Sequence, residues 1–194
     1  NSDASITGGD FADATVENYD GSVTGGVFNG FKLENGVLTI TGTVDLKEDE
    51  DALAPLTIGL DAESIQSIIV EANATFNAGN NAVTVDVTCN GTITGGTFKG
   101  AITGTGELAG GDFSGADISA FNGTITGGTI TGPVTNSGEI TGGTFKGLVG
   151  ASATEPGVIS GGTFENIVTT SPSCVISGGD FKNATVTGGG GIIN

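Results

Sequence analysis

The stretch Ile93-Thr94-Gly95-Gly96-Thr97-Phe98 occurs in eight versions along this chain. They begin at Ile6, Val23, Ile93, Leu108, Ile125, Ile140, Ile159 and Ile176. From Ile93 onward, the versions follow one another at steps of 15, 17, 15, 19 and 17 residues. A repeat this short cannot bury its own apolar side chains, so it needs copies of itself stacked on either side. The sequence therefore predicts a solenoid.

Strand alternation within one repeat places Ile93 inward and Thr94 outward. The Gly-Gly pair is expected to turn with positive φ and reset the face, so that Phe98 points inward and Lys99 outward. A second corner is expected at Gly100, where Gly, Asn or Asp tolerates left-handed backbone. Its equivalents are Asp13, Gly115, Gly147, Asn166 and Asn183. An internal ladder is predicted from Phe11, Phe28, Phe98, Phe113, Phe145, Phe164 and Phe181, with Ile130 in one coil.

The predicted fold is all-β, a right-handed parallel β-helix (β-solenoid) with coils of about 15–19 residues. Right-handedness is expected because parallel crossovers are strongly biased to that hand. Residues 1–194 are interpreted as one domain, with regular coils at 6–28 and 93–185 and longer irregular coils at 29–92. A separate small β domain at 29–92 is the alternative. Within that segment, residues 64–70 could form a short helix, but their β-branched side chains favour a strand.

The composition excludes several classes of partner. The chain has 22 acidic residues, five lysines, no arginine and no histidine, which gives a formal charge of −17. A nucleic-acid-binding protein needs a basic footprint, and an anionic membrane surface repels such a chain. No segment approaches the ~20 apolar residues of a membrane span, and no signal peptide opens the sequence. Both ends fall close to repeat units, which suggests an excised portion of a longer protein or end-to-end association.

Two cysteines, Cys89 and Cys174, are predicted to be unpaired. Five repeat steps separate their coils, and stacked strands rise ~4.8 Å each, so the gap is roughly 24 Å. A disulfide requires Cα atoms within ~7 Å. We therefore expect both thiols to behave as small buried apolar groups.

The repeated phrases resemble a known class of bacterial sequence. Segments such as ITGGTF, ISGGTF, GTITGGTFKG and ITGGTFKGLV are similar to repeats in β-solenoid regions of secreted or surface-anchored proteins of anaerobic gut bacteria. The resemblance is best over residues 93–185, fair over 6–28 and weak over 29–92. It implies an extracellular, adhesin-like or glycan-facing role and carries no catalytic residues with it.

The residue types in this sequence exclude several catalytic mechanisms. Without histidine, a Ser-His nucleophile and a zinc site built on His and Cys are both impossible. Asp10, Asp112 and Asp180 share a repeat position with threonines, which indicates an outward corner and not a catalytic carboxylate pair. The run Glu48-Asp49-Glu50-Asp51 could gather a hard cation, but a solvated loop is the preferred interpretation. No cofactor is expected.

The candidate site is a row of outward polar side chains: Thr94, Lys99, Thr126, Thr141, Lys146 and Lys182. They predict a non-catalytic extracellular surface module that contacts host or microbial glycans or surface proteins. A carbohydrate-active β-helix enzyme, a polysaccharide lyase or hydrolase, is one alternative and needs clustered acids in a groove. An ice-binding protein is another. It needs a flat Thr-x-Thr ladder, as hinted at 92–94 and 124–126, although the varying coil length is expected to spoil the lattice match.

Overall fold

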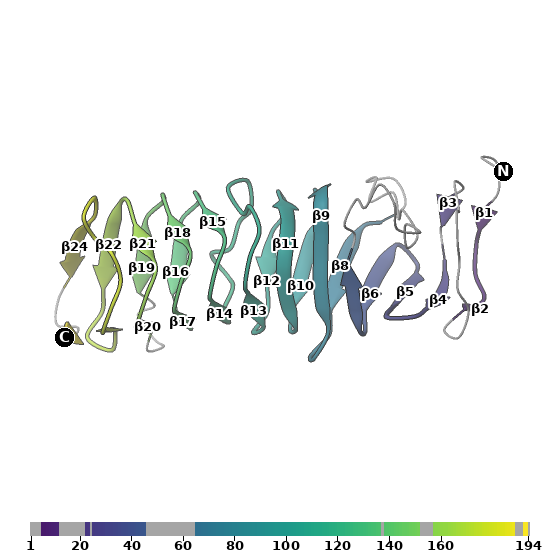
Figure 1. Ribbon diagram of the computed structural model, residues 1–194, viewed down its shortest axis with the longest axis horizontal. Coiled ribbons are helices and arrows are strands. Elements are labelled where there is room, and N and C mark those ends of the chain that lie inside the picture. The colour runs from purple at the N-terminus through teal and green to yellow at the C-terminus, as the bar shows by residue number, and fades with distance from the viewer. Residues whose placement is uncertain are drawn as a thin grey trace.

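The protein is an all-β parallel β-solenoid of about eight turns. The computed structural model describes residues 5–11, 22–23, 25–45, 65–136, 138–151, 157–188 and 192–193, and no helix occurs among them. Figure 1 shows the coils stacked along one long axis, with the two ends of the chain at opposite ends of the stack. The parallel β-solenoid is therefore confirmed, and the handedness of the coil and the single-domain organisation stay predictions.

A nine-stranded parallel sheet runs along most of the stack. Its strands, in spatial order, are β25 (Ile192–Ile193), β23 (Val175–Ile176), β20 (Val158–Ile159), β17 (Glu139–Ile140), β14 (Thr124–Ile125), β13 (Glu107–Leu108), β11 (Thr92–Phe98), β9 (Thr75–Val83) and β7 (Thr43–Asp45). The inward residue of each strand pairs in register with the next, as Leu108 does with Ile125 and Ile125 with Ile140. The first residue of the repeated phrase thus forms a continuous buried column.

Four smaller sheets complete the coils. The seven-stranded sheet has the order β12 (Ile102–Thr103), β10 (Asp86–Cys89), β8 (Ser67–Val70), β6 (Val37–Ile40), β5 (Phe31–Glu34), β4 (Gly26–Phe28) and β2 (Asp10–Phe11). A three-stranded sheet contains β15 (Thr129–Ile130), β18 (Thr144–Phe145) and β21 (Thr163–Phe164). A four-stranded sheet contains β16 (Val134–Asn136), β19 (Val149–Ala151), β22 (Ile167–Thr170) and β24 (Thr185–Gly188). The pair β1 (Ser5–Ile6) and β3 (Ser22–Val23) stands alone.

The phenylalanine ladder is confirmed over the regular coils. Phe98 and Phe113 stack with ring centroids 5.2 Å apart, and Ile130 takes the next place, in register with Phe145. Phe145 and Phe164 then stack at 4.9 Å, and Phe164 and Phe181 at 4.6 Å. The rings are buried except for that of Phe181, which is half-buried. Stacked aromatic rings at this separation add attraction beyond the burial of their area.

In the regular coils, the two glycines of a Gly-Gly pair are required for different reasons. The second glycine has positive φ, as at Gly96 (121°) and Gly143 (94°), which confirms the predicted face reset. The first glycine has no such φ. A Cβ on Gly142 would instead collide with the carbonyl oxygen of Thr126 in the preceding coil. Close backbone approach between coils therefore excludes a larger residue at Gly142, and the same holds at Gly161 and Gly178, whereas a Cβ at Gly8 would meet no atom within 4 Å.

The predicted left-handed backbone at the second corner is wrong. Among the described residues at that position, which are Gly100, Gly115, Gly147, Asn166 and Asn183, none has positive φ. A Cβ on Gly100 would collide with the backbone of Val85, and one on Gly147 with the backbone of Gly132. Glycine is thus needed there because coils approach closely. Asn166 uses its side chain differently, since its Nδ2 donates to the Lys146 carbonyl oxygen at 3.2 Å.

The segment before the regular coils contains an antiparallel insertion that the sequence analysis did not predict. Strand β5 pairs antiparallel with both β4 and β6, whereas β6 pairs parallel with β8. The turn between β5 and β6 is Asn35-Gly36, with φ of 51° and 76°. Positive φ at both central residues defines the type I′ turn that suits a two-residue hairpin. The predicted preference for strand at residues 64–70 is confirmed by β8, which begins at Ser67.

Candidate functional site

The three predicted threonines lie in one outward column. Each follows the inward Ile column of the nine-stranded sheet, whose register aligns Thr94, Ala109, Thr126, Thr141, Ser160 and Ser177. Thr126 and Thr141 occupy successive coils, while Ala109 separates Thr94 from Thr126. Thr94 and Thr141 are exposed, and Thr126 is half-buried. The structure therefore places these side chains on one face, with a gap at Ala109.

The three predicted lysines share a second outward column, directly after the phenylalanine ladder. The column reads Lys99, Ser114, Thr131, Lys146, Glu165 and Lys182, and all six residues are exposed. At ~4.8 Å per coil, Lys99 lies about 14 Å from Lys146, and Lys146 about 10 Å from Lys182, along the axis. The Lys182 Nζ lies 3.6 Å from Asp180 Oδ2.

The repeat position shared by aspartate and threonine forms a third column. Residues Thr97, Asp112, Thr129, Thr144, Thr163 and Asp180 pair along the axis. The Asp112 Oδ1 accepts a hydrogen bond from the Ser114 backbone N–H at 2.9 Å, and hydrogen bonds from Ser114 hold the pKa of Asp112 below its usual value. Asp180 Oδ1 accepts from the Lys182 N–H at 3.1 Å in the same way. Both carboxylates thus stabilise a local turn.

The spacing of these aspartates is unsuitable for a two-carboxylate mechanism. Asp112 and Asp180 are separated by four ladder steps, about 19 Å at ~4.8 Å per step. Glycosidases hold their two carboxyl groups within roughly 5–10 Å of each other. This separation agrees with the sequence interpretation that the position is an outward corner.

A closer carboxylate pair, Glu107 and Glu139, was missed by the sequence analysis. Both precede the inward Ile column, and Thr124 lies between them in register, so they are about 10 Å apart along the axis. Glu107 is half-buried, and its Oε1 accepts a hydrogen bond from Thr126 Oγ1 at 2.7 Å. Glu139 is exposed. Each glutamate immediately precedes a repeated phrase. An alignment of the repeats that included this preceding position would have shown the pair.

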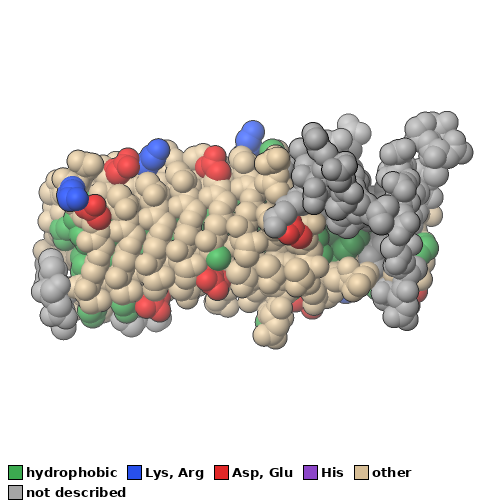
Figure 2. Space-filling view, in the orientation of Figure 1, with side chains coloured by type: hydrophobic (Ala, Val, Ile, Leu, Met, Phe, Trp, Pro, Cys, Tyr) green, Lys and Arg blue, Asp and Glu red, His purple; other side chains and the backbone are tan. Residues whose placement is uncertain are grey.

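The outward columns enclose a continuous polar strip that we call the hydroxyl face. It consists of Thr126, Thr141 and Ser160 on one side of three Gly-Gly pairs and Thr129, Thr144 and Thr163 on the other. Two glycines separate the two sides in each coil, so the Cα atoms of the flanking residues lie at most about 10 Å apart. Thr126 donates to Glu107, whereas the other five side-chain hydroxyls have no hydrogen-bond partner in the described part of the chain. Figure 2 shows a face of the solenoid on which charged side chains are few.

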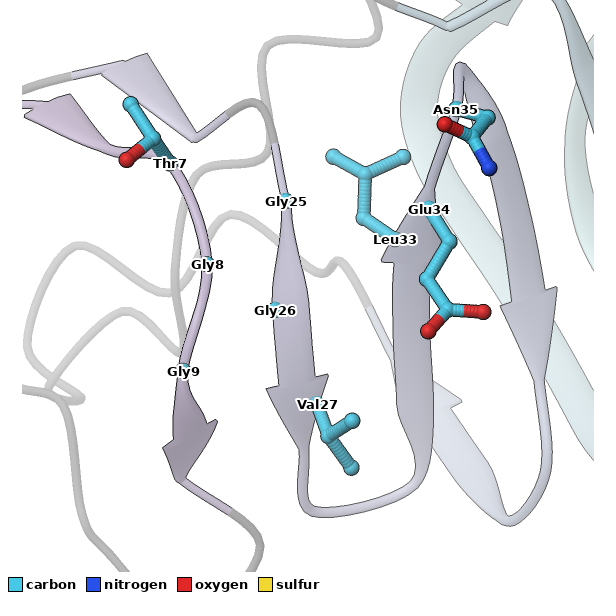
Figure 3. Close-up of a pocket in the computed structure, with 9 residues that line it drawn as sticks. All are labelled: Thr7, Gly8, Gly9, Gly25, Gly26, Val27, Leu33, Glu34 and Asn35. Atoms are coloured by element: carbon cyan, nitrogen blue, oxygen red, sulfur yellow. The ribbon is translucent and has the colours of Figure 1, made fainter.

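A cavity lies toward the N-terminal end of the solenoid, away from the hydroxyl face. Its volume is about 530 Å³, and it is lined by Thr7, Gly8, Gly9, Gly25, Gly26, Val27, Leu33, Glu34 and Asn35. Figure 3 shows Leu33 projecting from β5 toward Gly25, whereas Glu34 and Asn35 point away from Gly25. Four of the nine lining residues are glycines, and the polar side chains of the lining do not converge on one point. The cavity therefore lacks the arrangement of a built ligand site.

Metal-binding and thiol chemistry find little support in the described residues. They contain no group of three or more His, Cys, Asp or Glu side chains placed to hold a metal ion. The weak candidates Glu48, Asp49, Glu50 and Asp51 lie outside the described residues. Cys89 and Cys174 are buried and unpaired, as predicted. Burial raises the pKa of the Cys89 thiol to about 11, so it is a poor nucleophile at neutral pH.

The fold and these columns together define a parallel β-solenoid with ordered outward polar side chains. Comparison of the chain with protein-family models, curated proteins and solved structures found no match. Within the described residues, no helix is both long enough and apolar enough to span a membrane.

Proposed function

We propose that this chain is a non-catalytic extracellular surface module that contacts an extended glycan or surface protein through its outward strand faces. The observation that carries the proposal is the hydroxyl face, because five of its six hydroxyls are without a hydrogen-bond partner among the described residues. A regular row of such groups suits shallow contacts repeated along a long partner. The resemblance of the repeats to surface proteins of anaerobic gut bacteria supports the extracellular location.

The electrostatics support the same class of function. A charge of −17 disfavours nucleic acids and anionic membrane surfaces as partners. The lysine column is interrupted by Glu165, and Lys182 pairs with Asp180. Contacts of this kind are expected to be individually weak, so repetition of the module in a longer protein would raise the avidity.

Glycan arrays and surface-protein binding assays test the proposal directly. We expect binding to at least one extended glycan or protein, with no change in the partner's chain length after prolonged incubation. Depolymerisation of a polysaccharide that is lost in Glu107→Gln or Glu139→Gln would establish the carbohydrate-active alternative instead. The absence of both binding and turnover would reject the contact function.

A second candidate, ice binding, is favoured by one observation. Thr129, Thr144 and Thr163 remain in register although the coils that separate them differ in length. Differences in coil length therefore leave the register of this ladder unchanged, and the expected mismatch to an ice lattice stays a prediction. A gap between the freezing and melting points of a protein solution, lost in Thr144→Lys, would support this candidate. Equal freezing and melting points would exclude it.

A further inference from the structure

We infer that the partner of the hydroxyl face is a neutral, linear polysaccharide whose chain runs parallel to the solenoid axis. This inference rests on the proposed function, and it adds the chemical class and the direction of the partner. It is carried by the geometry of the two hydroxyl columns, by their free hydrogen-bonding groups and by the balance of charges beside them.

The direction follows from the columns. Along the axis, three successive coils each present one hydroxyl on either side of the Gly-Gly pair. Adjacent coils are ~4.8 Å apart, so the hydroxyls recur at a spacing comparable to the length of a sugar unit. Across the axis, one coil presents only two such groups. A linear polymer therefore meets the largest number of hydroxyls when it lies along the solenoid.

The neutral character follows from the charges that border the face. On one side, Lys146 is the lysine of its column that lies beside the three coils of the hydroxyl face, and Asp112 lies two coils away in the neighbouring column. Glu165 follows Lys146 in the same column, so the cation has acidic neighbours. On the other side lie Glu107 and Glu139. With no net basic strip and a chain charge of −17, a polyanion is repelled and a neutral polymer is not.

The free hydroxyls supply the recognition chemistry. Each hydroxyl can donate one hydrogen bond and accept others, as the hydroxyls of a sugar ring can. The Gly-Gly pairs leave the backbone between the columns without side chains, so a ribbon-like polymer can approach both columns together. Thr144 and Thr163 occupy successive coils in register, which lets one polymer chain contact both.

Native affinity electrophoresis tests the inference with the full chain. The gels contain hydroxyethylcellulose, xyloglucan or galactomannan as neutral probes, or polygalacturonate as the anionic probe. The triple variant Thr129→Val, Thr144→Val and Thr163→Val removes three hydroxyls and keeps the β-branched shape that a strand favours. Thr103→Val on β12 is the matched control, because Thr103 is half-buried on another sheet.

We expect retardation by at least one neutral polysaccharide. The triple variant should bind about tenfold or more weakly, because three modest hydrogen bonds are lost, while Thr103→Val binds like the parent. The triple substitution Thr129→Ser, Thr144→Ser and Thr163→Ser restores the hydroxyls and should restore binding, which separates recognition from folding. Raising the salt from about 0.05 M to about 0.5 M should leave the affinity nearly unchanged, since no charges pair.

Three kinds of result overturn the inference in distinguishable ways. Binding to polygalacturonate alone, weakened by salt, or binding to a protein alone, would reject the neutral glycan and leave the proposed function intact. Binding that is unaffected by the triple valine variant would reject the hydroxyl face as its location. Failure to bind every polysaccharide and protein probe would reject the inference and the proposed function together.

Discussion

The regular coils at 93–185 and the hairpin segment at 26–40 use the same few residue types to opposite effect. In the regular coils, Gly-Gly pairs interrupt a chain whose strands pair in parallel with the next coil. In the hairpin segment, Asn35-Gly36 reverses the chain, and β5 runs antiparallel between its neighbours. Glycine therefore lies at a corner in both regions. The residue before it and the number of positive φ angles decide whether the next strand continues the parallel coil or forms an antiparallel hairpin.

The difference also appears in how the cores are built. The regular coils bury a stack of phenylalanine rings, as between Phe145 and Phe164, with Ile130 in the place of one ring. The hairpin segment instead buries cross-strand pairs, which are Leu33 with Leu38 and Phe31 with Ile40. Stacking depends on identical neighbours, whereas a hairpin is stabilised within itself. Mutations should therefore affect the two regions differently.

The largest effect is expected from Phe145→Ala in the regular coils. Phe145 is 1% exposed and stacks on Phe164, so truncation leaves a cavity that identical neighbours cannot fill. We expect a loss of about 3–5 kcal/mol in the free energy of unfolding, measured by urea denaturation. Phe181→Ala, at the half-buried end of the ladder, should cost less. Equal losses at both positions would contradict the stacked core.

Next in size is Gly142→Ala, which tests the close approach between coils. The new Cβ would collide with the Thr126 carbonyl oxygen, and we expect a destabilisation of about 1–3 kcal/mol by thermal or urea unfolding. Gly150→Ala is the matched control, because its Cβ would have only ordinary contacts at 3.8 Å. A control variant as unstable as Gly142→Ala would refute the steric explanation.

A smaller, local effect is expected from Gly36→Ala in the hairpin. Its φ of 76° is strained for alanine, so the cost should be about 1 kcal/mol. Hydrogen exchange should show faster exchange at β5 and β6 and unchanged protection at β18 and β21. Equal loosening of both regions would mean that the hairpin is not an independent source of stability.

The smallest effect concerns the pH dependence of the regular coils. Hydrogen bonds from Ser114 lower the folded-state pKa of Asp112 below its ordinary value of ~3.9. Its stabilising contribution is therefore complete above that value and is lost as the pH falls through the lowered folded-state pKa. Asp112→Asn should show a slightly shallower loss of stability than the parent between about pH 5 and pH 2. Parallel curves would show that the turn does not depend on the carboxylate charge.

The sequence predicted the columns of the regular coils because identical phrases must pair with themselves. Thr126 and Thr141 could be placed outward from alternation alone, whereas Lys146 also required the face reset at the Gly-Gly pair. The hairpin carried a recognisable signal, Asn35-Gly36 between alternating strands, but the absence of the repeat phrase there obscured it. Phe76 lies opposite Ile93 in the Ile column, and β9 accommodates its extra residues later, between Asn77 and Ala82, a register that no local pattern predicts.

Other parts of the candidate site depend on contacts between coils. The Glu107–Thr126 hydrogen bond joins residues 19 apart, so only the ladder register reveals it. The same holds for the free hydroxyls, since a sequence does not show which side chains lack partners. The role of Gly100 and Gly147 was also beyond sequence reasoning, because it arises from the backbone of the preceding coil.

The persistence of register through coils of unequal length has an evolutionary consequence. The step from Ile140 to Ile159 is longer than the step before it, yet both residues remain aligned in the same ladder. Insertions can therefore accumulate between strands while the outward columns keep their spacing. Duplication of a coil lengthens the face by one fixed increment of ~4.8 Å and adds one more pair of outward positions. The length of the outward face therefore changes only in whole coils, and the number of repeats sets that length.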